Sequence, residues 1–390
     1  MINTFSFANT PQLYFGTGKI STLPAISKTF GSKILLITGA NSFQSAAYSS
    51  TLLDQLNANE CVIEHCTIDK EPTPFMIDDA VNKFASFNCD VVVALGGGSA
   101  LDAGKAISAM LPVKDSVKHY LEGVGTKIHP GVKIPFIAIP TTSGTGSEAT
   151  KNAVLSETGE NGYKKSLRHN NFVPNVAILD PSLTLSCPQT RTAASGMDAF
   201  TQLLESYLST TANPITDALA IEGLKRIAAS LLNAYHDGTN VNARSDMTMA
   251  AYLSGITLAN AGLGLVHGFA SSVGGYYEIP HGVICSSMMA AANKITVQKL
   301  RSEKSNIEAL EKYATVGRLF SDQQNKSNEY YIDSLLDLIS NWTDEMNIPK
   351  LSRGGVTLND VEKIVKSTDN KNNPVKLNND EIEEVLKMTL

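Results

Sequence analysis

The first half of the chain alternates short apolar runs with stretches of helical periodicity. The apolar runs are rich in Val, Ile and Leu and fall at residues 33–39, 61–66, 90–95, 134–140 and 175–180. Runs of about four to six apolar residues without polar alternation are typical of strands buried on both faces, as in a parallel sheet covered by helices. This half is therefore predicted to form a doubly wound α/β fold.

From about Thr190 the hydrophobic pattern changes to long segments with helical period, rich in Ala, Leu, Met and Ser. Two prolines flank the Ser/Thr-rich stretch between the two patterns, which is typical of a connection between domains. We predict an α/β domain over residues 1–185 and an all-α domain over residues 186–390. A chain of 390 residues is long enough for two domains with a cleft between them.

Composition and charge narrow the range of partners. Apolar residues make up 43% and charged residues 18% of the chain, which are ordinary values for a folded globular protein. The formal net charge is −6 without a long run of Lys or Arg, so neither nucleic acid nor a membrane surface is expected as a partner. No secretory signal and no membrane-spanning stretch is recognisable, so we expect a cytoplasmic protein that acts on small molecules.

The cysteines do not indicate disulfide or thiolate metal chemistry. They are odd in number and lack CxxC spacing, at positions Cys61, Cys66, Cys89, Cys187 and Cys285. This pattern fits neither a disulfide framework nor a thiolate zinc site. We expect buried, free thiols.

A glycine loop follows the predicted strand at 90–95. Gly96, Gly97, Gly98 and Ser99 form the expected turn, and residues 101–110 continue with helical spacing. A strand that runs through glycines into a helix brings backbone N–H groups and the positive end of the helix dipole to one point, where a pyrophosphate can bind. The alternative is a tight strand-to-helix turn without a ligand.

A second polar loop follows the predicted strand at 134–140. It contains five hydroxyl residues and two glycines before Glu148. Because ligands bind at the carboxyl ends of strands in open α/β sheets, two such loops favour a nucleotide site over ordinary polar loops. The GxGxxG fingerprint is absent after the first strand, which argues against a standard Rossmann domain.

Polar residues of the second half can surround a metal ion. His267 lies late in a helical, Gly-containing segment, and His281 opens another helix. The predicted helix at 196–209 carries a polar stripe opposite its apolar face, formed by Asp198, Gln202 and Glu205. The alternatives are hydrogen-bonded core histidines and a solvated helix face. We prefer the metal hypothesis because all three elements occur together.

Four segments together resemble the signatures of the iron-containing (group III) alcohol dehydrogenase family: GGGSALDAGKAI, PTTSGTGSEAT, GMDAFTQLLESY and NAGLGLVHGFASSVGGYYEIPHG. The resemblance runs from TPQLYFGTGKI near the start to DNKNNPVKL near the end, so it covers nearly the whole chain. It implies a dehydroquinate synthase-like fold with an α/β dinucleotide-binding domain, a helical metal-binding and substrate domain, and NAD(P) in the cleft between them.

The resemblance also implies which residues form the site. The cofactor would contact Gly97, Gly98, Ser99, Asp102, Thr141, Thr142, Ser147 and, at the nicotinamide ribose, Lys164. The metal ligands would be Asp198, Gln202, His267 and His281. Catalysis would involve Lys164, Ser271 and His267.

Two residues depart from the family pattern. Gln202 stands where the family usually has a histidine, and a neutral amide oxygen is a weaker ligand for Fe²⁺ or Zn²⁺ than imidazole, so metal affinity should fall and the metal's identity stays open. Ser271 stands where the family often has a histidine that helps to pass the alcohol proton. Proton exit is therefore expected to run through Ser271, a ribose hydroxyl and water.

Coenzyme choice is predicted from the loop after the first strand. An acidic residue there would accept the ribose 2′-hydroxyl of NAD and repel the 2′-phosphate of NADP, but this chain has Gly39, Ala40, Asn41 and Ser42. NADP(H) is therefore expected to be tolerated and slightly favoured.

The leading hypothesis is an NAD(P)-dependent, metal-dependent alcohol dehydrogenase or aldehyde reductase, active as a homodimer. The metal would polarise the substrate oxygen while C4 of the nicotinamide exchanges hydride with the carbon. One alternative is a metal-free reductase of the maleylacetate reductase type, which the altered ligand set would suit. Another is a lyase or synthase on the dehydroquinate synthase-like scaffold.

Overall fold

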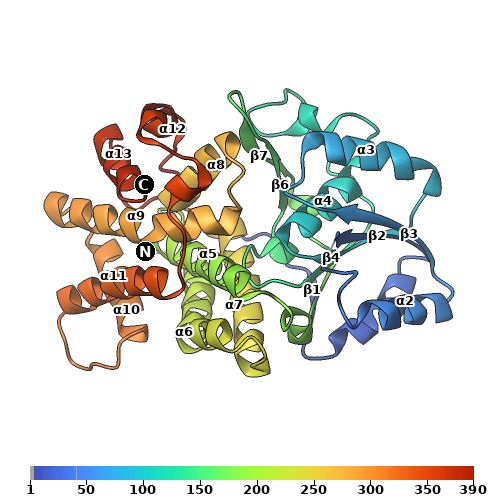
Figure 1. The fold of residues 1–390 in the computed structure, drawn as a ribbon, viewed down its shortest axis with the longest axis horizontal. Coiled ribbons are helices and arrows are strands. Elements are labelled where there is room, and N and C mark those ends of the chain that lie inside the picture. Colours follow the sequence, from blue (N-terminus) through green and yellow to red (C-terminus); the bar gives the residue numbers. More distant parts are fainter. Residues whose placement is uncertain (1–3, 41) are drawn as a thin grey trace.

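The computed structural model describes residues 4–40 and 42–390. The first half of the chain builds a parallel sheet of six strands in the order β1-β8-β5-β4-β2-β3 (Figure 1). These strands are β1 (Gln12–Phe15), β2 (Lys33–Gly39), β3 (Val62–Ile68), β4 (Val91–Gly96), β5 (Phe136–Pro140) and β8 (Val176–Leu179).

Helices cover both faces of this sheet: α1 (Leu23–Lys28), α2 (Ser49–Ala58), α3 (Pro74–Phe84) and α4 (Gly98–Met110). Alternate residues of β4 belong to different cores. Val92 and Ala94 pack with residues of α3 and α4, whereas Val91 and Val93 pack with residues of α1 and α2. Because both faces are buried, the strand is apolar throughout, and the predicted doubly wound α/β fold is confirmed.

The structure corrects the predicted strands in two respects. The run at 61–66 is not buried on both faces, because β3 is an edge strand and its Val62 is 54% exposed. Sequence reasoning also missed β1 and the antiparallel hairpin of β6 (Asn152–Glu157) and β7 (Tyr163–Arg168). These strands alternate polar and apolar residues or are half exposed, so they lack the apolar run that marked the others.

The second half is helical, as predicted. Its α-helices are α5 (Gln189–Leu208), α6 (Pro214–His236), α7 (Val241–Ala261), α8 (Leu265–Tyr276), α9 (His281–Glu303), α10 (Ile307–Leu319), α11 (Asn328–Glu345), α12 (Val361–Ser367) and α13 (Asn379–Lys387). They gather on one side of the sheet and share one large apolar core (Figure 1). The division at residue 185 stays a prediction; β8 ends at Leu179 and α5 begins at Gln189.

Within the described ranges, no single helix is long and apolar enough to cross a membrane. Together, α7 and α8 have the length and apolar composition of a membrane span, but they are bent by 96° relative to each other. Most residues of both helices are buried in the folded protein.

Candidate active site

The carboxyl ends of β2, β4 and β5 lie next to one another at one edge of the sheet. From β2 the chain continues to β3 on one side and then returns to β4 on the other. The carboxyl ends of the neighbouring strands β2 and β4 therefore mark the switch point of the sheet, where ligands of open α/β folds bind. Both predicted polar loops border this edge.

The glycine loop ends in the N-terminus of α4, which has no side-chain cap. Gly97 is the N-cap residue, and Gly98 and Ser99 belong to the first turn of the helix rather than to the preceding turn. The first N–H groups of a helix have no partner within it, so this end can receive an anion. A Cβ at Gly97 would lie 3.4 Å from Thr142, and one at Gly98 only 2.7 Å from Thr145, so the two loops touch.

Asp102 and Ser147 lie in a polar network behind these loops. The Ser147 hydroxyl donates to Asp102 Oδ1 over 2.5 Å, and Lys105 Nζ donates to the Ser147 carbonyl over 2.7 Å. Burial raises the pKa of Asp102 and lowers that of Lys105 to about 8. The network fixes the second loop to α4. Sequence reasoning did not single out Lys105, although a lysine between apolar helix positions was a signal for it.

The loop after β2 faces the same edge. Gly39 ends the strand, and a Cβ there would lie 2.6 Å from the Ser42 hydroxyl oxygen. No acidic side chain occurs at residues 39–43. Asn41, which was predicted to contact the coenzyme, lies outside the described residues.

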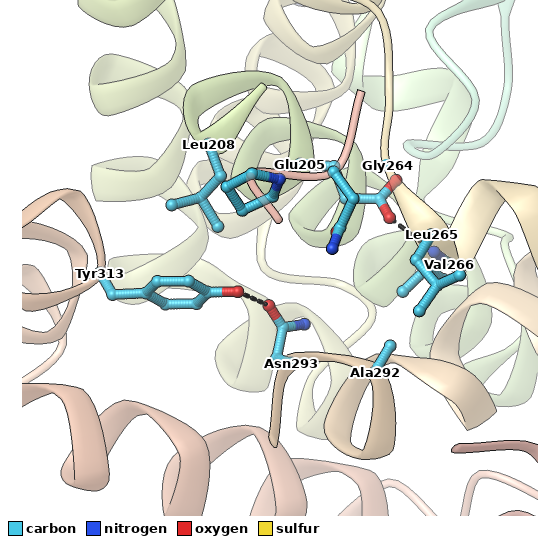
Figure 2. A pocket seen from close by; sticks show the side chains of 10 residues that line it. Glu205, Leu208, Gly264, Leu265, Val266, Ala292, Asn293 and Tyr313 are labelled. Carbon is cyan, nitrogen blue, oxygen red and sulfur yellow. Dashed lines mark hydrogen bonds between the residues drawn. The ribbon is translucent and has the colours of Figure 1, made fainter. Parts of the chain in front are cut away.

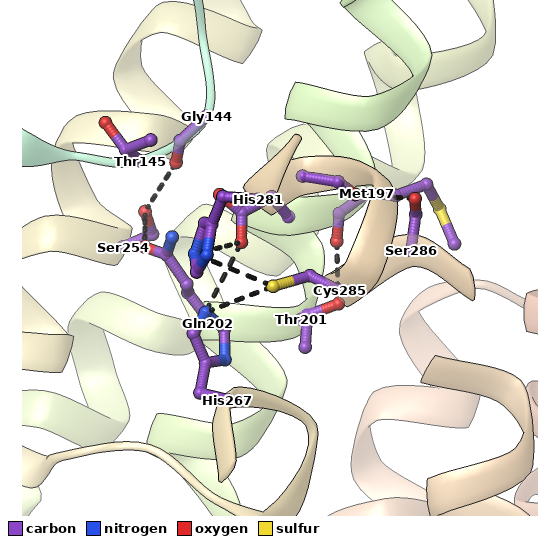
Figure 3. Close-up of polar contacts among 12 residues, drawn as sticks. Gly144, Thr145, Met197, Thr201, Gln202, Ser254, His267, His281, Cys285 and Ser286 are labelled. Carbon is purple, nitrogen blue, oxygen red and sulfur yellow. Dashed lines mark hydrogen bonds and ion pairs between the residues drawn. The ribbon is translucent and has the colours of Figure 1, made fainter. Parts of the chain in front are cut away.

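A buried donor cluster forms where α5, α8 and α9 meet. Asp198 Oδ1 lies 3.4 Å from His267 Nε2 and 3.8 Å from His281 Nε2. Cys285 Sγ lies 3.6 Å from each of these nitrogens. Figure 3 shows the sulfur and the two imidazoles converging on one point. All four donor atoms lie within 4.8 Å of one another, close enough to hold one metal ion.

The electrostatics of the cluster favour a cation. Asp198 Oδ1 is buried and has no hydrogen-bond partner, a costly arrangement that a bound cation would relieve. Burial opposes ionisation of Asp198, but His281 and His267 outweigh it and lower the carboxyl pKa to about 2. Burial lowers the pKa of His281 to about 4, although Asp198 opposes this shift. A carboxylate and a neutral imidazole are the forms in which these groups bind metals.

His267 is the third residue of α8 and does not lie late in a helix as predicted. The helical segment breaks because α7 ends at Ala261 and Gly262 adopts a left-handed φ of 69°. Burial lowers the pKa of His267, but Cys285 and Glu205 outweigh it and raise this pKa well above its usual range.

Glu205 positions His267 from behind. Its Oε2 lies 2.7 Å from His267 Nδ1, and its Oε1 accepts from the Val266 N–H over 2.7 Å. Figure 2 shows Glu205 in a small pocket whose opposite wall carries the hydrogen bond from Tyr313 to Asn293. A carboxylate on the far nitrogen fixes the ring so that Nε2 faces the metal position. The polar stripe of α5 is thus buried, not solvated.

Gln202 lies one turn after Asp198 on α5. Its Oε1 accepts a hydrogen bond of 2.9 Å from the Ser254 hydroxyl, and its amide helps to lower the pKa of Asp198. The same Ser254 hydroxyl lies 3.5 Å from the Gly144 carbonyl (Figure 3). Metal ligation by Gln202 stays a prediction.

Lys164 of β7 reaches towards the start of α9. Its ammonium lies 2.5 Å from Glu71 Oε2, and Glu71 Oε1 accepts from the His281 N–H over 3.2 Å. Burial raises the pKa of Glu71, but Lys164 outweighs it and the net pKa is lowered. Sequence reasoning missed Glu71 because it lies in a loop without a motif.

Ser271 lies one turn after His267 on α8. Its hydroxyl donates to the His267 carbonyl over 2.9 Å, and Lys371 Nζ lies 3.4 Å from the same oxygen. The side chain is half-buried. Its part in proton transfer stays a prediction.

The chain thus combines a helix N-terminus that can bind a phosphate with a side-chain cluster that can bind a metal ion. Oxidoreductases that use a dinucleotide together with a metal ion have the same combination. Two family profiles agree with this class: "Iron-containing alcohol dehydrogenase" matches residues 10–181, and "Fe-containing alcohol dehydrogenase family, C-terminal" matches residues 192–390. The chain belongs to the iron-containing alcohol dehydrogenase family and is an oxidoreductase of CH–OH groups. The family resemblance seen in the sequence is confirmed.

Individual relatives support this assignment. The chain is 34% identical over 309 residues to alcohol dehydrogenase 4 of Saccharomyces cerevisiae, covering 78% of this chain and 79% of the relative. It is 37% identical over 273 residues to 1,3-propanediol dehydrogenase of Citrobacter freundii, covering 69% and 70%. A crystal structure of 1,3-propanediol oxidoreductase superposes over 100% of both chains with a TM-score of 0.88 at 29% identity. Sulfoacetaldehyde reductase from Bifidobacterium kashiwanohense, in complex with NAD⁺, covers 99% of both chains with a TM-score of 0.81 at 25% identity.

Proposed function

We propose that the chain is an NAD(P)-linked, metal-dependent alcohol dehydrogenase or aldehyde reductase. The observation that carries the proposal is the buried, unpartnered Asp198 Oδ1 beside two imidazole nitrogens at 3.4 Å and 3.8 Å. Carboxylate and imidazole donors suit Fe²⁺ or Zn²⁺. When bound, such a metal polarises the oxygen of an alcohol or aldehyde, and the coenzyme exchanges the hydride.

The residues around the cluster would orient its ligands, bind the coenzyme and transfer the proton. Glu205 holds His267 in its orientation, and Glu71 holds Lys164 near the start of α9. Lys164 would bind the nicotinamide ribose, as the family resemblance implies. Ser271 would carry the alcohol proton away with a ribose hydroxyl and water.

The coenzyme would lie across the switch point of the sheet, with its pyrophosphate at Gly97, Gly98 and Ser99. Two observations support this place: the uncapped N-terminus of α4, and the room beside Gly97 that a side chain would fill. The threonines Thr141 and Thr142 follow directly at the end of β5. Asp102 and Ser147 would support the loops through their hydrogen bond.

Finer assignments belong to the same proposal. NADP(H) would be accepted and slightly favoured, because no acidic side chain at residues 39–43 repels its 2′-phosphate. Residues 1–185 would form the coenzyme domain and residues 186–390 the metal and substrate domain. The enzyme would act in the cytoplasm as a homodimer.

The test is removal and return of the metal. Activity should be lost on dialysis against a chelator and return with Fe²⁺ or Zn²⁺, with metal content followed by elemental analysis. The assay would use NADH and NADPH with ethanol, 1,3-propanediol, longer alcohols and their aldehydes, and the two values of kcat/KM measure coenzyme preference. Full activity at zero metal content would contradict the proposal and support the metal-free reductase instead.

A further inference from the structure

Cys285 has no role so far, yet its sulfur is one of the four donor atoms of the cluster. It sits on α9 one turn after His281, so both side chains project from the same helix face. The thiol is completely buried, and the Sγ atom lies 3.6 Å from His267 Nε2 and 3.6 Å from His281 Nε2 (Figure 3).

Four of the separations between the donor atoms lie close to those of a tetrahedral metal site. Bond lengths of about 2.0–2.1 Å to oxygen or nitrogen and about 2.3 Å to sulfur place neighbouring ligand atoms about 3.3–3.6 Å apart. The observed separations are 3.4 Å and 3.8 Å from Asp198 Oδ1 to the two imidazole nitrogens, and 3.6 Å from each nitrogen to the sulfur. All four donor atoms lie within 4.8 Å of one another, so one metal ion has room to lie among them.

Gln202 is placed to support this site from outside. Its carbonyl oxygen lies 2.9 Å from the Ser254 hydroxyl, which also lies 2.8 Å from the Ala251 carbonyl oxygen. The amide follows Asp198 by one turn of α5 and helps to keep the carboxyl group ionised. Independently of the cysteine, Asp198 Oδ1 is a buried, unpartnered acceptor that points into the cluster.

We propose that Cys285 is a ligand of the metal, and that Asp198, His267, His281 and Cys285 form a site selective for Zn²⁺. The inference rests on the metal site of the proposed function and deepens it by naming the fourth ligand. Binding is a simple exchange: the thiol proton leaves to solvent as the sulfur–zinc bond forms, and nothing is oxidised or reduced. Thiolate softness and the general order of metal affinities both rank Zn²⁺ above Fe²⁺.

One of the four donor residues is partly exposed to solvent. The His281 side chain is 26% exposed, whereas Asp198 and His267 are buried and Cys285 is fully buried. Among the four donor residues, His281 is therefore the one that solvent reaches. The sequence pattern indicated no thiolate zinc site, because a single cysteine without CxxC spacing becomes a ligand only through its tertiary neighbours.

The experiment uses Co²⁺ as a spectroscopic probe of the full-length protein after chelation. Wild type should bind one Co²⁺ per chain and show a thiolate-to-cobalt charge-transfer band in the near ultraviolet. Cys285→Ala should retain weaker Co²⁺ binding without this band, and its dissociation constant for Zn²⁺ should rise by more than the roughly 10–100-fold that loss of an outer-sphere partner causes. The matched control is Cys89→Ala, another buried thiol, which should leave band and affinity unchanged.

The outcomes separate the two proposals. Stoichiometric Co²⁺ binding by wild type without the charge-transfer band would overturn ligation by Cys285 and leave the metal-dependent function standing. Failure of wild type to bind Co²⁺, Zn²⁺ or Fe²⁺ would overturn the proposed function itself. If Cys285→Ala does not fold, the wild-type spectrum still decides. A dissociation constant for Fe²⁺ equal to or below that for Zn²⁺ would refute the selectivity.

Discussion

Glu205 affects the proposed metal site although it is not one of the ligands. Both of its oxygens are engaged, with His267 Nδ1 and with the Val266 N–H. Glu205→Gln removes the charge that keeps Nδ1 a donor, and we expect it to weaken Zn²⁺ binding about 10–100-fold. Competition with a chromophoric chelator measures the change.

The control for this variant is Glu311→Gln, an exposed residue of α10 that lies outside the cluster. It should leave the affinity unchanged. Zinc affinity of Glu205→Gln within about twofold of wild type would show that His267 is held by helix packing alone, since a lost outer-sphere partner costs at least about tenfold.

The ion pair of Glu71 and Lys164 makes stability depend on pH. Burial raises the pKa of Glu71, but Lys164 outweighs it, so the folded-state pKa lies below the unfolded value. A carboxyl group of this kind stabilises the fold above its unfolded pKa of about 4.3, and that contribution is lost as pH falls through the folded pKa. Glu71→Gln should therefore lower Tm most near neutral pH.

Differential scanning fluorimetry of Glu71→Gln and wild type over a pH series checks this expectation. The difference in Tm should shrink as pH falls below about 4.3, where the carboxyl group of the unfolded chain is protonated first, and should disappear below the lowered pKa of the folded state. A gap of the same size at every pH would mean that the variant acts through packing rather than through charge.

At the scale of elements, two adjacent glycines at the N-terminus of α4 are expected to affect different properties: one coenzyme binding, the other the stability of the fold. A Cβ at Gly97 keeps 3.4 Å from Thr142, an acceptable contact, whereas one at Gly98 would meet Thr145 at 2.7 Å. Gly97→Ala should keep the Tm of the coenzyme-free protein but weaken NAD(P)H binding by at least about tenfold, ~1.4 kcal/mol, because the methyl group occupies the phosphate position. Gly98→Ala should instead destabilise the fold itself, by about 1–3 kcal/mol.

Coenzyme titration followed by fluorescence, together with thermal unfolding, distinguishes the two glycine variants. Equal coenzyme affinity of Gly97→Ala and wild type would show that the phosphates bind elsewhere. Metal content should stay at the wild-type level in both, since neither glycine contacts the donor cluster.

The elements that could be predicted are those whose burial shows in the local pattern of apolar and polar residues. Five strands of the sheet and the helical second half were predicted because apolar runs and helical periods need no knowledge of neighbours. The strand β1 and the β6–β7 hairpin were missed because partner strands, not local apolarity, stabilise them. Asp198, His267 and His281 lie together as the family resemblance implied. Cys285 gave no signal because it is a single cysteine without CxxC spacing, and Glu71 joins the site only through packing of a distant segment.

At the scale of the whole molecule, the coenzyme loops and the donor cluster are tightly connected. A Cβ at Gly255 of α7 would lie 2.2 Å from the Gly146 carbonyl oxygen, so the helical half packs directly on the second loop. Ser254 then contacts both Gly144 and Gln202, and Gln202 contacts Asp198. If the coenzyme binds at this loop as proposed, the side chains of Ser254, Gln202 and Asp198 form a short route from the loop to the donor cluster.

The place of β1 at the edge of the sheet also bears on how the protein is made. Gln12 pairs with Val176, about 160 residues later, and within the described residues β8 is the only strand that pairs with β1. At roughly 5–20 residues per second, a ribosome needs about 8–32 s to produce β8 after β1 has emerged. The nascent sheet can form β2 to β5 first and has to keep its amino-terminal segment unpaired until β8 follows. Completion of the α/β half is therefore coupled to translation of the segment that leads into α5.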